Sequence, residues 1–541
     1  MTDPETRSSG ATADTPVAGH PVLEMRGIRK VFGPVVALDG VDFEVGASEV
    51  HGLLGGNGAG KTTLMNVLYG LYRPDAGTVR LGGEEMVVRN PRDAITHGIG
   101  MVHQNFLQVE SYTVTENIVL GTRQPSFPTL NLRGAEANVA DLSERFGITV
   151  DPRAQVGQLS VGIRQRVEIL KALYRGARIL VLDEPTTSLT PQEVDSLFGS
   201  LRAIVDEGMS VVFITHKIRE TMAVCDELTI MRDGRCVSTL HRRDTTARDL
   251  AMLMVGDEQT AERVAAVISG GSQGTEHPAP VGQVRPFATV AQRVEANDLT
   301  ADNDHGVRAI HGLDFGIARG EVLGIAGVAG NGQVELAESL AGVRPLSGGT
   351  VDVDGVALAG QPTAQWLMAG VAYVPEDRHR DGILPAASII ENLVLGAQRS
   401  PRFRKWGLID WSAARRHAVE TMSAYSVKAS GASAAAATLS GGNIQRVILA
   451  RAFALYPGFL ILHNPTRGLD IGSTQFVYDR VREAAAEGTS VLLLSEDLDE
   501  LTHLADRILV VYAGRAVGER LRGEYDQYEL GRFMAGVLEQ T

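Results

Sequence analysis

The chain has 541 residues, of which 44% are hydrophobic and 21% charged, a globular composition that excludes disorder over most of its length. Its 51 basic and 65 acidic residues leave a net charge of −14, which argues against a protein that binds nucleic-acid phosphates. Two cysteines exclude a disulfide framework and a four-cysteine zinc site and favour a reducing cytosol, and the sequence shows neither a secretory signal nor the ~18 apolar residues that a membrane span needs.

A glycine-rich loop between a predicted strand and a predicted helix is the first strong motif. It reads GGNGAGKT over residues 55–62, follows the apolar run 50–54 and precedes a predicted helix over 63–69. Backbone N–H groups of such loops surround phosphate oxygens at a helix N-terminus. Lys61 is predicted to reach the β- and γ-phosphates, and the Thr62 hydroxyl to bind Mg²⁺. The expected nucleotide-binding residues are Gly55, Gly56, Asn57, Gly58, Ala59, Gly60, Lys61, Thr62 and Thr63.

Two carboxylates end the apolar run ILVLDE, residues 179–184. A strand of this kind in a sheet core delivers its last side chain beside the phosphate loop, so Asp183 is predicted to hold Mg²⁺ through water. Glu184 comes next and is predicted to polarise the attacking water as general base. The alternative is that these carboxylates are only solvent-exposed at the end of a strand, which explains one carboxylate readily but two less well.

Three further residues are candidates whose pattern alone is weaker. Gln104 follows the apolar pair Met101-Val102, and His216 ends a predicted strand over 211–215. Each by itself is more typical of a structural polar residue. Phe32 lies 23 residues before Gly55, a position from which an aromatic ring can stack on adenine or pack in the core.

The chain repeats itself. EVHGLLGGNGAG from Glu49 resembles EVLGIAGVAGNG from Glu321, an offset of 272, and LSVGIRQR from Leu159 matches LSGGNIQR from Leu439 at an offset of 280. The second copy therefore carries about eight extra residues between Glu376 and Leu439. A duplicated and fused domain is the simplest explanation.

The predicted organisation follows from the repeat. Residues 1–20 lack periodicity and predict a disordered tail, and residues 258–292 contain a Gly/Ser/Pro-rich linker. Domain 1, residues 21–257, lies between them, and domain 2, residues 293–541, follows the linker and ends in a predicted helix from Asp526. Within each domain, short runs that are apolar on both faces alternate with helical stretches, so we expect an α/β architecture with a parallel sheet covered on both sides.

The order of phosphate loop, LSVGIRQR and ILVLDEP resembles the ATP-binding cassette (ABC) ATPases, and LSGGNIQR matches their signature loop almost letter for letter. VHQNF at His103, TVTENIVLG at Thr113 and YVPEDRHRDG at Tyr373 are similar to the double-cassette ATPases of simple-sugar and nucleoside importers. The resemblance implies two fused P-loop NTPase domains, each with a mixed, largely parallel sheet core, an α-helical subdomain and an antiparallel β part. The segment from Val167 to Glu193 is closer to the nucleoside-import branch, with the ribose and galactose type as the alternative.

Roles for single residues also come from the resemblance. It implies that Gln104 senses the γ-phosphate and joins Thr62 and Asp183 as a Mg²⁺ ligand, that His216 contacts the γ-phosphate and the attacking water, and that Phe32 stacks on adenine. The domains would pack head to tail, with each ATP between one phosphate loop and the opposite signature loop, here Ser440, Gly441 and Gly442. Expected partners are two integral-membrane permeases and an extracytoplasmic binding protein, with no nucleic acid, at the cytoplasmic face of the membrane.

The second copy has lost the chemical residues of the first. At the positions equivalent to Phe32, Lys61, Thr62, Gln104, Asp183, Glu184 and His216 stand Asp304, Gln333, Val334, Glu376, His463, Asn464 and Glu496. A glutamate that faces a γ-phosphate repels it. The signature loops differ in the complementary sense, because the first copy has Val161 at a signature glycine and Thr190 where the second has Asp470. One hydrolytic composite site and one degenerate site are predicted, with nucleotide binding at the latter left open.

Two other classes compete with an importer ATPase. A soluble tandem cassette protein that acts on ribosomes usually has two intact sites and a charged helical linker, unlike this chain. A nucleotide-binding regulator without catalysis would not need the complete set formed by Lys61, Gln104, Asp183, Glu184 and His216.

Overall fold

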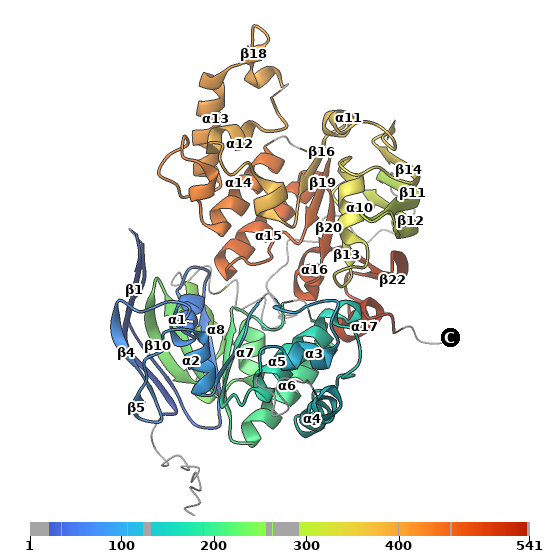
Figure 1. Cartoon of the computed structure of the whole chain (residues 1–541). Coiled ribbons are helices and arrows are strands. Elements are labelled where there is room, and N and C mark those ends of the chain that lie inside the picture. The colour runs from blue at the N-terminus through green and yellow to red at the C-terminus, as the bar shows by residue number, and fades with distance from the viewer. Residues whose placement is uncertain are drawn as a thin grey trace, which may run out of the picture. The chain divides into compact units, whose positions relative to one another are not determined.

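The computed structural model describes residues 21–33, 35–104, 106–122, 131–187, 189–255, 262, 292–398, 400–454 and 457–537. The predicted tail and nearly all of the predicted linker lie outside these ranges. The chain forms two compact units, one of Met1–Gln158, Arg166–Glu184 and Gly199–Thr246, the other of Leu159–Gln165, Pro185–Phe198 and Ala247–Thr541. Each is described by itself below (Figure 1).

A six-stranded sheet forms the core of the first unit, in the order β10-β9-β3-β8-β7-β6. All neighbours are parallel except β10, which runs antiparallel to β9. Every residue of β3, β6, β7 and β8 is buried, as the apolar runs predict. The strands are β3 (Val50–Gly55), β6 (Ile99–Val102), β7 (Ile179–Asp183), β8 (Ser210–Thr215), β9 (Glu227–Arg232) and β10 (Arg235–His241).

An antiparallel sheet completes the first unit, and the helices of the first copy pack around its two sheets or continue into the second unit. The sheet has the order β2-β1-β4-β5, formed by β1 (Leu23–Phe32), β2 (Val35–Val45), β4 (Ala76–Leu81) and β5 (Glu84–Glu85). The helices of the first copy are α1 (Lys61–Leu68), α2 (Pro91–Thr96), α3 (Val114–Val119), α4 (Leu132–Arg145), α5 (Val161–Tyr174), α6 (Pro191–Asp206), α7 (Ile218–Val224) and α8 (Ala247–Val255). The helix predicted over 63–69 begins two residues earlier, because Gly60 is its N-cap in a left-handed conformation.

The second unit repeats both sheets. The larger has the order β16-β19-β20-β13-β21-β22 and the smaller the order β12-β11-β14-β15, each matching its counterpart in the first unit strand for strand. The strands are β11 (Gln292–Asp302), β12 (Arg308–Ala318), β13 (Val322–Ala326), β14 (Gly348–Val353), β15 (Val356–Ala357), β16 (Val371–Val374), β19 (Phe459–His463), β20 (Ser490–Ser495), β21 (Arg507–Tyr512) and β22 (Arg515–Leu521). The predicted fold class is confirmed.

Helices of the second unit follow the same order. They are α10 (Gln333–Leu340), α11 (Thr363–Met368), α12 (Ile389–Val394), α13 (Trp411–Ala424), α14 (Gly441–Phe453), α15 (Ile471–Ala486), α16 (Leu498–Leu504) and α17 (Gln527–Met534). The predicted closing helix corresponds to α17, which Asp526 caps by accepting from the backbone N–H groups of Tyr528 and Glu529.

The eight extra residues of the second copy all lie in its helical part. The offset between copies is 272 at the first residues of β6 and β16, 275 at the N-caps Thr113 and Ser388, 279 at the first residues of α4 and α13, and 280 at the short helical turns Val156–Gln158 and Ala436–Thr438. The first increase coincides with a π-helical turn, Arg378–Gly382, and the second with a hairpin of β17 (Arg404–Lys405) and β18 (Leu408–Ile409).

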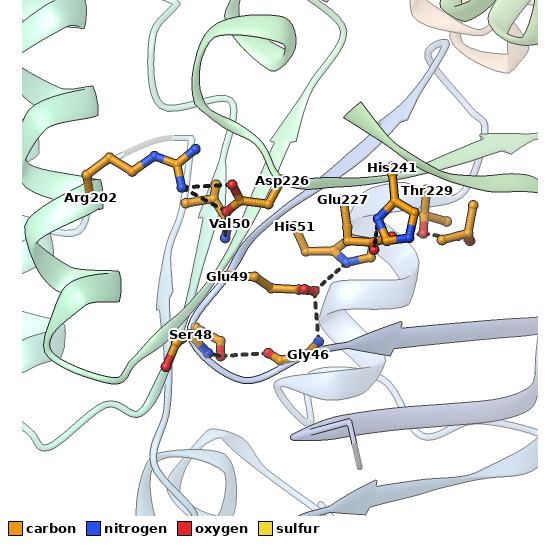
Figure 2. Close-up of polar contacts among 12 residues, drawn as sticks. Gly46, Ser48, Glu49, Val50, His51, Arg202, Asp226, Glu227, Thr229 and His241 are labelled. Carbon is orange, nitrogen blue, oxygen red and sulfur yellow. Dashed lines mark hydrogen bonds and ion pairs between the residues drawn. The ribbon is translucent and has the colours of Figure 1, made fainter. Parts of the chain in front are cut away.

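Polar contacts, one set buried and one half-exposed, join the strands and helix α6 of the first unit (Figure 2). His51 on β3 is 2% exposed, with Nδ1 3.0 Å from Glu49 Oε1 and Nε2 2.8 Å from Thr229 Oγ1 on β9. Both ring nitrogens have partners, which is the condition for burying an imidazole. Arg202 of α6 donates to both carboxylate oxygens of Asp226, which also accepts from the Val50 N–H.

Candidate functional site

The glycine loop turns sharply from β3 into α1. Gly60 has φ 100°, and a Cβ there would stand 2.8 Å from the carbonyl oxygen of Ala37. A Cβ on Gly55 would stand 2.3 Å from the carbonyl oxygen of Met231. Both positions exclude a larger residue, because neither the backbone angle nor the neighbouring backbone leaves room for a side chain. The loop conformation therefore depends on these glycines.

Lys61, the first residue of α1, points its ammonium into the loop. Its Nζ donates to the carbonyl oxygens of Gly55 and Gly56 at 2.7 and 3.0 Å, and the residue is 6% exposed. A cation is thus held among the loop's own backbone, at the positive end of a helix, which is the arrangement that attracts phosphate.

Thr62 and Asp183 meet beside the loop. The Thr62 hydroxyl donates to Asp183 Oδ2 at 3.4 Å, which joins the start of α1 to the end of β7. Burial, together with the charge of Glu184, raises the pKa of Asp183 to about 6, against the opposing effects of Lys61 and Thr62. A hydroxyl and a carboxylate are the hard oxygen donors that Mg²⁺ prefers, with phosphates and water completing the shell. These residues fit the predicted Mg²⁺ site.

Glu184 stands at the centre of the remaining candidates. His216 Nδ1 lies 3.0 Å from its Oε1, and Gln104 Nε2 donates to its Oε2 at 3.2 Å. Burial alone would raise the pKa of Glu184, but the hydrogen bond and charge of His216, with Lys61 and Lys217, lower it below its usual value. The structure therefore brings Gln104, Asp183, Glu184 and His216 together and keeps the proposed base ionised.

Glu184 also has an unusual backbone. Its φ is 48°, in the left-handed region that a non-glycine residue rarely occupies, and its N–H donates to the carbonyl oxygen of Ile214 at 2.9 Å. The turn directs its carboxylate toward the end of β8, where His216 lies. Backbone strain of this kind is common at functional residues.

Phe32 ends β1 with 42% of its surface exposed. It packs edge-on against Tyr72, with ring centroids 5.1 Å apart and planes at 73°, and the Lys30 ammonium lies 5.4 Å from its centroid. An exposed ring held at its edge keeps a face for a planar ligand. Sequence reasoning missed Tyr72, because nothing in its local pattern separates it from the other ten tyrosines.

The signature residues of the second copy open α14. Ser440 is its N-cap, Gly441 and Gly442 are its first residues, and Asn443 Nδ2 donates to Ser440 Oγ at 2.8 Å. A Cβ on Gly441 would stand 3.1 Å from Arg378 Nη2. The loop therefore presents backbone N–H groups at a helix N-terminus with an arginine beside them.

The second unit places its replacement residues where the first has its site. Gln333 is 6% exposed at the start of α10, and Val334 is 40% exposed beside it. His463 is 3% exposed at the end of β19, and burial lowers its pKa to about 4, so its imidazole is neutral at physiological pH. Asn464 keeps the left-handed conformation of its counterpart, with φ 45°, and accepts from the Glu496 N–H at 3.1 Å.

Glu376 has partners that were not among the residues predicted from the sequence. Arg467 donates to its Oε1, and His463 Nε2 lies 3.7 Å from its Oε2. This cation weakens the expected repulsion between Glu376 and a γ-phosphate, because the pair is close to neutral. The signal was available in the repeat, where Thr187 stands at the position of Arg467. Asp304, at the position equivalent to Phe32 in the second copy, is paired with Arg344 at 2.7 Å.

A groove of about 300 Å³ lies beside Gln104 in the first unit, between the end of α1, β6 and α5. The Lys171 ammonium of α5 donates to the carbonyl oxygen of Leu107 at 3.0 Å and lies 3.5 Å from Glu168. This bond ties the segment after Gln104 to α5, the helix that begins at the first signature loop. Leu107 itself is 67% exposed.

Among the described residues, no helix is long and apolar enough to cross a membrane.

Comparisons with known proteins agree with these observations. The family described as "ABC transporter" matches residues 38–187 and 310–467. The chain is 41% identical over 554 aligned residues to the glucose import ATP-binding protein TsgD13 of Haloferax volcanii, with 96% of this chain and 97% of that protein covered.

Two further relatives cover nearly the whole chain. The nucleoside import ATP-binding protein NupA of Lactococcus lactis is 38% identical, with 96% of this chain and 99% of that protein covered. The ribose import ATP-binding protein RbsA 1 of Streptomyces avermitilis is 38% identical, with 92% and 90% covered.

Proposed function

Because the chain belongs to the ABC transporter family, as an ATP-binding ATPase with two cassettes in tandem, we propose that it drives the import of a small solute across the cell membrane. It acts at the cytoplasmic face, with two integral-membrane permeases and an extracytoplasmic binding protein as partners. The observation that carries the catalytic part of this proposal is the Glu184 carboxylate, held between His216 and Gln104 next to the Lys61 loop.

Each predicted site residue of the first unit has a proposed role in ATP binding or hydrolysis. The loop N–H groups and Lys61 bind the β- and γ-phosphates, and Thr62, Gln104 and Asp183 hold Mg²⁺, which neutralises phosphate charge when bound. Glu184 accepts a proton from the attacking water, and His216 orients the carboxylate and contacts the γ-phosphate. Phe32 stacks on adenine.

Hydrolysis is confined to one composite site. Ser440, Gly441 and Gly442 of the second copy close over the nucleotide of the first. The equivalent second site lacks the phosphate lysine, the metal hydroxyl and the base, since Gln333, Val334 and Asn464 replace them. The second site therefore does not hydrolyse ATP.

Replacing Glu184 with Gln tests the site. The amide keeps the shape but cannot accept a proton, so phosphate release should fall by roughly 10²–10⁴-fold while ATP binding persists. Asn464→Ala, at the same place in the second unit, is the matched control and should leave phosphate release near the wild-type rate. A Glu184→Gln protein that still hydrolyses ATP at a substantial rate would assign hydrolysis to another site.

The groove beside Gln104 is the proposed docking place for a permease loop. Leu107 offers an exposed apolar side chain, while Glu168, Lys171 and Arg175 supply charges around it. Since Gln104 contacts Glu184 on one side and precedes this groove on the other, movement of the segment links nucleotide state to the permease.

A nucleoside is the proposed cargo. The resemblance of residues 167–193 to the nucleoside branch supports it, as do relatives named for nucleoside and guanosine import at 38% and 39% identity. A simple sugar is the second candidate, supported by the 41% identical relative named for glucose import. Titration of the partner binding protein with nucleosides and with simple sugars distinguishes them, because that protein contacts the cargo.

A further inference from the structure

We propose that the second unit carries a surface that binds the anionic headgroups of the membrane, formed by the β17–β18 hairpin and the exposed face of α13. We call it the basic aromatic patch, and its principal residues are Arg404, Lys405, Trp406, Trp411, Arg415 and Arg416. It extends the proposed function, which brings the chain to a membrane but gives this surface no role.

The patch is exposed to a degree that packing does not explain. Trp406 is 93% exposed, Leu408 75% and Trp411 51%. The chain has three tryptophans, and the third, Trp366, is 2% exposed. Figure 1 shows the hairpin at the outer end of the helical part of its unit, beyond α13 and away from the sheet. Exposed aromatic side chains that cluster in this way mark an interaction site.

The hairpin turn holds its tryptophan in a costly conformation. Trp406 and Gly407 connect the two strands with φ 58° and 83°. A two-residue turn with both angles positive favours Asn-Gly or Gly-Gly, and a bulky side chain there is an outlier. Trp406 loses almost none of its surface to the rest of its unit, so internal contacts do not offset that cost. A partner outside the chain is the explanation that remains.

The charge of the patch is opposite to that of the chain. The hairpin and α13 carry five exposed cations and two carboxylates, whereas the chain as a whole has a net charge of −14. The cations are Arg402, Arg404, Lys405, Arg415 and Arg416. One carboxylate, Asp410, caps α13 by accepting from the Ser412 and Ala413 N–H groups, and the other, Glu420, lies 4.0 Å from Arg402. Three positive charges therefore remain in excess and call for an anionic partner.

The first copy does not have such a segment in its sequence. Residues 120–131, LGTRQPSFPTLN, contain one basic residue and no tryptophan, whereas residues 395–410, LGAQRSPRFRKWGLID, contain four basic residues and one tryptophan. The hairpin also coincides with four of the extra residues of the second copy. The patch is thus particular to the second copy.

Lipid headgroups fit these properties better than the alternatives. Tryptophan favours the membrane–water interface, and clusters of Lys and Arg bind anionic lipids. A nucleic acid would meet a strongly acidic chain, and a permease loop already has the groove beside Gln104. The patch would anchor the second unit laterally to the bilayer around the permease.

Flotation of the full chain with lipid vesicles tests the proposal. Wild-type protein should float with phosphatidylcholine vesicles that contain phosphatidylglycerol, remain behind with phosphatidylcholine alone, and dissociate at high salt. Two variants should lose flotation, Trp406→Asn, which suits the turn better than the native residue, and the double variant R404E/K405E. At roughly fivefold for each positive charge near an anionic surface, the double variant should bind at least tenfold more weakly. Trp406→Asn should also reduce the blue shift of tryptophan fluorescence on vesicle addition, with Trp411 as the patch tryptophan that remains.

The matched control is R133E/R243E, which reverses two exposed cations of the first copy and should float as wild type. Equal flotation of all variants would overturn the proposal, as would equal loss in the control or release by inorganic phosphate. Normal flotation with failure to assemble with the permease would make the patch a protein contact and overturn it too. Basal phosphate release by the same samples tests the ATPase separately, because no patch residue belongs to the nucleotide site.

Discussion

Two neighbours, Gln104 and His216, position the Glu184 carboxylate, and they affect its ionisation differently. Gln104 and His216 each hold one of its carboxylate oxygens, but only His216 can carry a positive charge, and it is among the groups that lower the Glu184 pKa. A base held by an amide alone would be less well oriented and less firmly ionised.

Replacing His216 with Ala should therefore reduce phosphate release by about 10²-fold, with ATP binding largely retained because the loop and Lys61 are untouched. Steady-state phosphate release and equilibrium ATP titration check the two parts. Glu496→Ala, at the equivalent position of the second unit, should change neither. A similar loss in both variants would mean that the two units contribute equally.

Residue-scale prediction from sequence succeeded where the signal was local. The loop at 55–62 and the pair Asp183-Glu184 were predicted because each directly follows or ends an apolar strand. The structure places Thr62 of the loop beside Asp183. Partners from distant segments escaped, since a single sequence does not say that Tyr72 reaches Phe32 or that Arg467 reaches Glu376. The second of these was readable only by aligning the copies.

At the scale of elements, equivalent helices bury a glutamate in different surroundings. In the first unit Thr215 donates to Glu220 of α7 at 3.4 Å, and the Lys217 ammonium lies 3.5 Å away. In the second unit Ser495 donates to Glu500 of α16 at 2.6 Å, but Asp497 stands at the lysine position. Burial first, and then the Asp497 charge, raise the pKa of Glu500 from 4.5 to about 7.

This difference makes the stability of the second unit depend on pH. Between pH ~4.5 and ~7 the folded state keeps a proton on Glu500 that the unfolded state has released, so the free energy of unfolding falls as pH rises through that window and levels off above it. Glu500→Gln removes the dependence, and its midpoint of thermal unfolding should rise relative to wild type as the pH goes from 5 to 8. Glu220→Gln, which breaks an ion pair, should not gain stability in the same series. A constant difference between Glu500→Gln and wild type across the series would exclude this role.

The sequence predicted the main strands and helices but not the short elements between them. Apolar runs identified the buried strands, since both faces of a central parallel strand are covered. The hairpin β17–β18 was not foreseen, because two-residue strands leave no periodic pattern and its turn carries tryptophan where asparagine is usual.

For the whole molecule, duplication preserved the sheets and let the chemistry diverge. Strand order is the same in both units, while the loop, strand-end and signature residues differ in a complementary way. The proposed composite site makes hydrolysis in the first copy depend on a serine of the second.

Ser440→Arg should therefore abolish most phosphate release, by roughly 10²-fold, because a bulky cation replaces a donor that closes over the γ-phosphate. Ser160→Arg, the equivalent change in the first signature loop, faces the degenerate site and should retain most of the activity. Phosphate release by the two purified variants decides. If Ser160→Arg is the more damaging change, the assignment of signature loops to sites is reversed.

The imidazole and amide at the C-terminal end of strand β19 in the second unit also bear on stability. Ionised groups withdrawn from water weaken a fold until a ligand or counter-ion compensates them. The first unit keeps one such carboxylate, Asp183, at the end of β7, since burial and the charge of Glu184 raise its pKa to about 6, whereas His216, Lys61 and Lys217 already compensate Glu184. Above pH ~6 the ionised Asp183 therefore costs the first unit stability, a cost that a cation bound between Thr62 and Asp183 would offset. The other half has a neutral imidazole, His463, at the position of Asp183, so no buried carboxylate charge weakens the end of its strand at neutral pH.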